Sequence, residues 1–526
     1  MRLAVRISTP RLPTTLVAAR TIEWLPPLSA AAYVVLVAVR FPALVRALYW
    51  NSDAAGAFVL GELLRGQGAV EIPRFGWWTS LWWLLATREL PGHEHVWEAT
   101  GYVFALATVA LVGWATWRVA GRWAGMTAAA AAVVVGPKAL TSLLTVNFHT
   151  STPFTDAVLG AYLVVLARSR SWVLAIAVGV LAGVDAASDP LLWIAGIAPF
   201  ALGAGVLAVA TKRRDVAGHA AVMLGVTVVS VAATDRVMSS LGFHIIPVGL
   251  KLAGAADLVP NFIGLGKSIA LVFGANHFFP GVYPSEPIRY AITLLAFAAL
   301  AATLLAAVRL TLRRSEPTVR AYASYWATAA VLIGLAFWTT NQGSGPGGGL
   351  NYMLTLAPAA GVGVGLLAAG SSTGRIAVSL AIAAVGAVNI AGIAHGRAAE
   401  HAGARTYGPQ LIRLLEREGL TRGYAPFWDA QSLTWKSGMR LLVAPVQPCN
   451  PRRGGALCRM PFFTIDSWYY ERPGPSFLIV DPAQGLATKP PPTFGRPSES
   501  HRLGPDITVY VYPYDLARHI RRRHIR

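Results

Sequence analysis

The residues best suited to chemistry are a few acids at the ends of long apolar segments. Asp53 follows the first such segment in Tyr49-Trp50-Asn51-Ser52-Asp53, about one helical turn beyond its end. A carboxylate there can take a proton from a hydroxyl group as that hydroxyl attacks another molecule. We therefore single out Asp53 as a candidate catalytic residue. The alternative is that it only caps the helix expected over residues 54–65, a role that Asn51 or Ser52 could also fill.

Other polar side chains follow in the later loops. Asp156 ends the polar run 147–156, and Asp189 precedes a proline in the run 185–190. We predict substrate contacts for both, although each also fits an ordinary loop or helix-start position.

Three more substrate-binding residues are predicted in the long stretch 236–288, namely Lys267, His277 and Tyr283. If a reaction at the membrane edge releases a phosphate group, cations or hydrogen-bond donors must stabilise that phosphate, because water is scarce there. His277 stands among Asn276 and two phenylalanines, and aromatic rings beside polar groups suit a sugar.

Long membrane helices must position these residues. The chain has 526 residues, 54% hydrophobic and only 13% charged, with a mean hydropathy of +0.50. Runs of about 20 apolar residues recur, and each can cross a hydrocarbon core of roughly 30 Å. The sequence thus predicts an all-α polytopic membrane domain over residues 1–394. About 11 helices are expected, over residues 28–48, 100–119, 123–144, 157–167, 173–187, 191–210, 219–235, 289–308, 322–340, 352–370 and 376–394.

The basic residues predict the orientation. Lys and Arg gather in alternate links, as in Lys212-Arg213-Arg214, and are sparse in the links between them. Because cytoplasmic loops carry the excess of Lys and Arg, we expect a cytoplasmic N-terminus in the plasma membrane. The first loop (49–99) and the fourth (236–288) are then long outer loops. The formal net charge of +20 fits this pattern, and no basic stripe on a soluble domain points to nucleic acid.

The last part of the chain, residues 395–526, is predicted to be a small extracytoplasmic α/β or α+β domain. It combines one amphipathic segment, 407–419, with short strand-like runs. The two cysteines of the chain, Cys449 and Cys458, both lie here. In an oxidising compartment they are expected to form a disulfide. A metal site is the rival interpretation, but two thiols alone make a poor zinc site.

This layout resembles the GT-C superfamily of membrane glycosyltransferases, which includes protein O-mannosyltransferases, aminoarabinose transferases and arabinosyltransferases. The resemblance covers the whole chain in layout and is most specific at residues 49–64, with weaker support at 182–193. The Ala-, Val- and Arg-rich composition is also typical of actinobacterial proteins.

The resemblance implies a polyprenyl-phosphate-linked sugar as donor. It implies a cell-envelope glycan, lipid or protein as acceptor, and an acid of the first outer loop as base, which matches Asp53. Several relatives have an adjacent acidic pair, whereas Ala54 follows here, and no Asp-x-Asp surrounds Asp156. No metal ligand is therefore assigned, and a divalent metal ion stays open as cofactor. The alternatives are a transporter or flippase of a lipid-linked envelope precursor and a non-catalytic membrane scaffold.

Overall fold

The structure is a computed structural model of the whole chain. It describes residues 22–48, 52, 55, 56, 59, 70–73, 94–144, 149–246, 251–277, 285–313, 315–341, 349–369, 371–395, 402–449, 456–460, 462–482, 490–503 and 507–521. Asp53 and Tyr283 lie outside the described residues.

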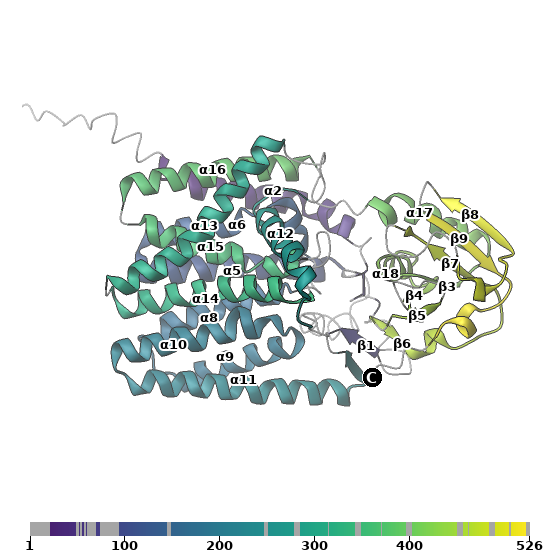
Figure 1. Cartoon of the computed structure of the whole chain (residues 1–526), viewed down its shortest axis with the longest axis horizontal. Helices are drawn as coiled ribbons and strands as arrows, with labels where there is room; N and C mark the ends of the chain where they lie inside the picture. Colours follow the sequence, from purple (N-terminus) through teal and green to yellow (C-terminus); the bar gives the residue numbers. More distant parts are fainter. Residues whose placement is uncertain are drawn as a thin grey trace, which may run out of the picture.

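Long apolar helices build the larger part of the molecule (Figure 1). In the described part of the chain, nine helices are long and apolar enough to cross a membrane, or ten if one bent pair counts as a span. Many of their large apolar side chains face outward, as Val39, Val229 and Leu294 do, which suits contact with lipid. The helices are α2 (Leu25–Leu48), α5 (Glu94–Ala120), η1 with α10 (Trp193–Ile197 and Ala198–Thr211), α11 (Arg214–Ser240), α12 (Ala255–Val272), α13 (Glu286–Leu312), α14 (Pro317–Thr339), η3 with α15 (Leu350–Met353 and Leu356–Ala368) and α16 (Ser372–Ala394).

The predicted span 123–144 is broken. Helix α6 (Arg122–Val133) and helix α7 (Pro137–Leu144) meet at an angle of 86°. The bend lies where another segment approaches closely, because a Cβ on Gly136 would stand 2.6 Å from Gly274. The Asn389 side chain donates to the carbonyls of Val134 (3.3 Å) and Phe273 (3.2 Å), satisfying backbone that the break exposes.

The next two helices are short. Helix α8 (Ser151–Leu166) begins six residues before the predicted 157, and α9 (Trp172–Ser188) is close to the predicted 173–187. The polar residues at the start of α8 were predicted as loop, but they form helix because their side chains are buried against α9.

Helix α12 lies inside the predicted fourth outer loop. Its Asn261 donates to the carbonyls of Trp338 and Thr340 at the end of α14, at 3.1 and 2.9 Å. Just beyond its other end, the carbonyl of Phe273 meets Asn389, five residues from the end of α16. Five residues of helix rise about 8 Å. Both ends of α12 therefore lie near the same end of the bundle, and the helix runs across that end rather than through the membrane.

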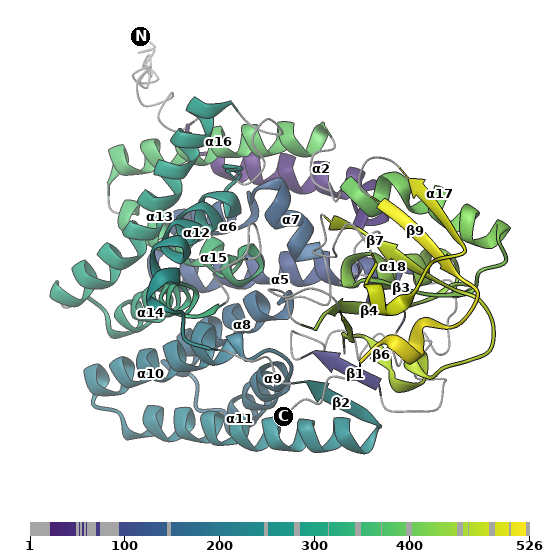
Figure 2. The same cartoon turned by 45° about the vertical axis from the view of Figure 1, so that its right-hand side comes forward.

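Residues 402–521 form a smaller α/β unit beside the bundle, and we call the bundle end that faces it the tail side (Figures 1 and 2). Its six-stranded sheet has the order β5-β4-β3-β7-β9-β8, with β4, β3 and β7 parallel. Helices α17 (Ala402–Arg417) and α18 (Phe427–Lys436) pack leucines on the sheet. The strands are β3 (Arg422–Pro426), β4 (Leu442–Pro448), β5 (Leu457–Arg459), β7 (Ser476–Val480), β8 (Glu499–Leu503) and β9 (Ile507–Tyr512).

The predicted disulfide is confirmed. Cys449 follows β4 and bonds to Cys458 in β5, with a Cα–Cα distance of 4.9 Å. The fold class is likewise confirmed as a polytopic helical membrane protein with a small C-terminal α/β domain.

A second, three-stranded sheet joins distant segments. Strand β1 (Val70–Pro73) of the first predicted loop pairs in parallel with β2 (Phe243–Ile246) of the fourth, and antiparallel with β6 (Thr464–Ile465) of the α/β unit. Figure 2 shows this sheet between bundle and α/β unit. Both long loops and the α/β unit therefore meet at the tail side.

Candidate functional site

A buried group of acids lies where α8 begins and α9 ends, on the tail side. Asp156, Asp185 and Asp189 are all fully buried, and His149 is 2% exposed. Within this group, His149 Nδ1 lies 2.6 Å from Asp189 Oδ2, and Ser151 Oγ donates to Asp185 Oδ1 at 2.6 Å. We call Asp156, Asp185, Asp189 and His149 the acidic cluster. Because buried carboxylates repel one another, such a group favours binding a cation or a polyol that donates hydrogen bonds.

Local structure holds Asp189 and His149 in place. Thr152 donates to Asp189 Oδ2, and the amide of Leu191 donates to Asp189 Oδ1 at 3.0 Å. His149 has a left-handed backbone with φ of 49°, which is uncommon for a residue other than glycine. Such conformations gather at functional sites.

Asp156 is placed by three elements. The hydroxyl of Tyr325 in α14 donates to its backbone carbonyl at 2.7 Å. Thr355, just before α15, lies beside its carboxyl group. Gly196 in η1 leaves the room for that carboxyl group, because a Cβ there would collide with Asp156 Oδ1. Any larger residue at 196 would displace the carboxylate.

A basic group lies beside the end of α12. The pKa of His277 is lowered by burial and by the positive charges of Arg289 and Lys267. Arg289 Nη1 donates to the carbonyl of Asn276 at 3.2 Å, which ties the start of α13 to this segment. We call Lys267, His277 and Arg289 the basic cluster. It can bind an anion such as a phosphate.

The His277 tautomer follows from its neighbour. Thr293 Oγ1 donates its single proton to the carbonyl of Arg289 at 2.7 Å. His277 Nε2 lies 2.8 Å from Thr293 Oγ1. Because that hydroxyl has no second proton to donate, Nε2 carries a proton and donates it to Thr293 Oγ1. In the neutral ring, Nδ1 is then the acceptor.

The segment 349–355 lies between the two clusters. The ring of Tyr352 stands 4.7 Å from that of His149, centroid to centroid. A Cβ on Gly349 would lie 3.0 Å from Ser268 Oγ, next to Lys267 in α12. One short segment thus touches the acidic cluster on one side and the helix that carries Lys267 on the other.

An apolar groove of about 440 Å³ opens below the basic cluster. Ile292 in its wall is one helical turn from Arg289, and Phe273 is one turn's length before His277. The rest of the wall is mainly small side chains of α6, α13, α15 and α16, such as Ala131, Ala299 and Ala381. An apolar wall of this kind suits a hydrocarbon chain.

The α/β unit contributes buried acids on the same side. The amide of Gln431 donates to Ser52 Oγ at 3.2 Å, so α18 contacts the residue just before Asp53. In the same helix, burial raises the pKa of Asp429 to about 8, and the negative charge of Asp481 adds to this.

The predicted site residues thus fall into two groups. Asp156 and Asp189 meet in the acidic cluster, and Lys267 and His277 meet in the basic cluster. His149, Asp185 and Arg289 were not predicted, although the first two stand in the same polar runs as Asp156 and Asp189. Asp53 and Tyr283 belong to the undescribed residues.

No protein-family model and no curated protein matches the chain. Solved structures do match. ArnT from Cupriavidus metallidurans is similar with a TM-score of 0.52 and 13% identity in its apo state, over 91% of this chain and 97% of that chain. The same protein bound to undecaprenyl phosphate has a TM-score of 0.50 and 14% identity, over the same shares. The Archaeoglobus fulgidus oligosaccharyltransferase in its apo form has a TM-score of 0.45 and 12% identity, over 83% of this chain and 65% of its own. The likeness to ArnT shows a shared fold over most of both chains.

Proposed function

We propose that the protein is a membrane glycosyltransferase. It moves a sugar from a polyprenyl-phosphate donor to a cell-envelope glycan, lipid or protein, with Asp53 as general base. The observation that carries this proposal is the pairing, on the tail side, of a buried acidic cluster with a basic cluster above an apolar groove. The ArnT fold supports it, since one ArnT structure holds undecaprenyl phosphate.

The basic cluster and the groove bind different parts of the donor. The phosphate lies against Lys267 and Arg289, beside His277, and the polyprenyl chain runs into the groove. Positive charge at this point stabilises the phosphate that leaves with the lipid.

The acidic cluster binds the sugar, and the first outer loop supplies the base that acts on the acceptor. In the transfer, an acceptor oxygen bonds to the sugar's anomeric carbon while the bond from that carbon to the phosphate oxygen breaks. The acceptor's proton passes to Asp53, and the lipid phosphate keeps the bonding electrons. Asp156 and Asp189 hold the sugar through its hydroxyl groups.

A divalent metal ion suits the acidic cluster chemically. Its carboxylate oxygens are the ligands that Mg²⁺ and Mn²⁺ prefer. Such an ion would be held by Asp156 and Asp185 and would supply positive charge beside the sugar phosphate.

We further propose that the tail side is extracytoplasmic, that the N-terminus is cytoplasmic, and that residue 395 divides two domains. The opposite helix ends carry Arg122, Arg213, Arg313 and Arg375, as cytoplasmic ends do. The disulfide suits an oxidising compartment.

A transporter of lipid-linked precursors is the second candidate. The broken α6–α7 pair favours it, since interrupted helices line the binding sites of many transporters. A transporter would move the lipid between leaflets and leave its sugar–phosphate bond intact.

A transfer assay separates the two. The purified protein in nanodiscs is given radiolabelled polyprenyl-phosphate sugars and a cell-envelope extract. We expect label in the acceptor, and a loss of at least about 100-fold in rate for Asp156→Asn. The matched control is Asp215→Asn, which removes an acid paired with Arg213 at the opposite end of the bundle. Movement of lipid between leaflets without transfer would favour the transporter.

A further inference from the structure

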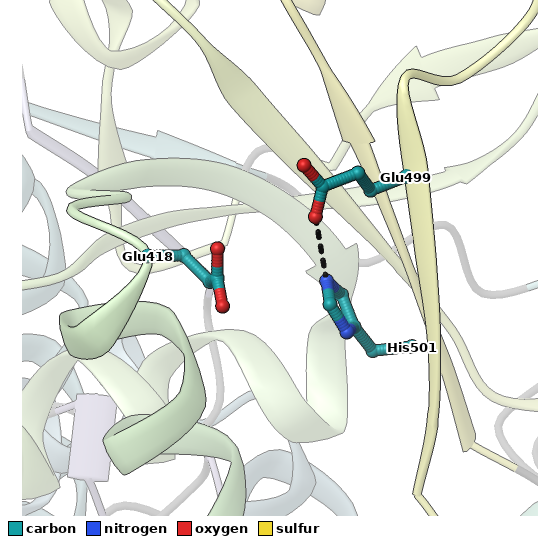
Figure 3. Close-up of side chains that lie close together, drawn as sticks. All are labelled: Glu418, Glu499 and His501. Atoms are coloured by element: carbon teal, nitrogen blue, oxygen red, sulfur yellow. Dashed lines mark ion pairs between the residues drawn. The ribbon is translucent and has the colours of Figure 1, made fainter.

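Three ligand-type side chains converge on the α/β unit, away from both clusters. Glu418 follows α17, and Glu499 and His501 lie on β8, the last strand of the six-stranded sheet. Figure 3 shows the three side chains pointing toward one another. One ligand atom from each lies within 4.8 Å of the others.

The backbone places them there. Glu499 and His501 are two residues apart in a strand and so share one face. Helix α17 packs Leu411 and Leu415 in the same apolar core that Leu503 of β8 covers. This packing brings the end of α17, and with it Glu418, against the strand.

In the described part of the chain, no Lys or Arg pairs with the two glutamates of this group. Glu416, two residues earlier, pairs with Arg440 at 2.7 Å. Within the described residues, Glu418 forms no ion pair, and Glu499 forms one only with His501, at 3.3 Å. In a chain with a net charge of +20, two acids that meet a histidine instead of an arginine suit a metal cation.

The histidine adds a second, independent sign. His501 Nε2 is closed off from solvent and makes no hydrogen bond within the described residues. It faces the Glu499 carboxylate at ion-pair distance without hydrogen-bond geometry. An imidazole nitrogen in that position is available to coordinate a metal ion.

We propose that Glu418, Glu499 and His501 bind a divalent transition metal ion, and Zn²⁺ in particular. One imidazole and two carboxylates suit Zn²⁺, whereas Mg²⁺ and Ca²⁺ prefer oxygen ligands alone. Zinc sits about 2.0–2.2 Å from such ligands. The two exposed glutamates can rotate inward to reach this distance, and water fills the fourth position.

The ion would tie α17 to the edge strand. Helix α17 is the first element of the α/β unit after the bundle, and β8 has a free edge. Because the metal binds the folded unit and not its separated parts, it raises the thermal stability of that unit in proportion to its concentration.

Zinc binding by the full-length protein in detergent tests this. Isothermal titration with ZnCl₂ and X-ray anomalous scattering at the zinc edge give stoichiometry and position. We expect one Zn²⁺ at Glu418, Glu499 and His501, and a dissociation constant raised at least about tenfold in Glu418→Gln and in His501→Ala. The matched controls are Glu416→Gln, two residues before Glu418, and His519→Ala, in the same unit, and we expect both to bind Zn²⁺ as the parent does.

Folding is checked by melting each variant in EDTA, where all should match the parent. If His501→Ala melts at a lower temperature than the parent in EDTA, the test rests on the zinc affinity of Glu418→Gln, whose substitution is at an exposed position. Absence of zinc at this position, or equal affinity in Glu418→Gln and Glu416→Gln, would overturn the proposal and leave only an ion pair between Glu499 and a protonated His501. Because the measurement involves no sugar transfer, its failure would leave the proposed function untouched.

Discussion

Replacing Gly196 by alanine is the sharpest test of the acidic cluster, because it adds one methyl group and no charge. A Cβ at 196 would overlap Asp156 Oδ1 and would stand 2.9 Å from Leu159 Cδ1 and from Leu192 Cδ1. Because the carboxylate oxygen is the nearest of these atoms, the carboxylate is the group that the added methyl group displaces most. It must move by about 1 Å to reach ordinary contact distance.

The expected result is a loss of activity out of proportion to the loss of stability. A 1 Å misplacement of a catalytic group costs about 100-fold in rate, whereas one added methylene in a packed core costs about 1–3 kcal/mol of stability. Gly205→Ala is the control, because a Cβ at 205 in the same helix meets nothing within 4 Å. There alanine should stabilise the helix by about 0.5–1 kcal/mol.

The assay is single-turnover transfer from a radiolabelled polyprenyl-phosphate sugar at saturating donor, with thermal unfolding measured on the same preparations. We predict that Gly196→Ala is folded at the assay temperature and transfers about 100-fold more slowly than Gly205→Ala. Equal rates in the two variants would refute the role given to the Asp156 carboxylate.

Three further predictions concern other parts of the molecule. Arg289→Ala should raise the KM for the donor by about tenfold or more, since a hydrogen bond to a charged group contributes about 1.5–3 kcal/mol. Replacement of the exposed Lys251 by alanine should leave this KM unchanged. Equal KM values in the two variants would contradict the placement of the phosphate at the basic cluster. Asp429 has a folded pKa of about 8 against 3.8 ordinarily, so the folded α/β unit holds a proton that the unfolded chain releases. Its free energy of unfolding should therefore be highest below pH 4 and fall between about pH 4 and 8, by at most about 1.4 kcal/mol per pH unit. Hydrogen exchange of the α18 amides in the intact protein should show this fall, and Asp429→Asn should flatten it; the same slope in the variant would contradict the assignment. Reduction of the Cys449–Cys458 disulfide should weaken protection of β4 and β5 in the same experiment by about 2–3 kcal/mol, and unchanged protection would count against that stabilisation.

The sequence predicted the membrane helices well where apolar residues run without interruption, as in α13 and α16. It missed α12 because Pro260, Asn261 and Lys267 interrupt the apolar run. The side-chain amide of Asn261 donates to carbonyls at the end of α14, a contact that no local pattern reveals. The bend at Gly136 likewise depends on the approach of Gly274 from far along the chain.

The sequence indicated the kinds of residue that form the site, but not all of its members. Acids in separate polar runs suggested Asp156 and Asp189, and both lie in one cluster. The polar stretch Ser151–Asp156 read as loop because serine, threonine and aspartate favour turns over helix interiors. Burial against α9 overrides that preference, and this same burial recruits His149 and Asp185. Arg289 stands at the start of the predicted helix 289–308, and its contact with Asn276 could not be foreseen.

The account's central claim is that this protein breaks the bond between a sugar and a polyprenyl phosphate, with Asp53 as the base. The most direct measurement follows free polyprenyl phosphate and labelled acceptor together, for the parent protein and for Asp53→Asn. We predict that the two products rise in equal amounts with the parent, and that both fall by at least about 100-fold in the variant while its melting curve is unchanged. Equal rates for parent and variant would contradict the role of Asp53, and no release of polyprenyl phosphate by the parent from any donor would contradict the proposed function itself.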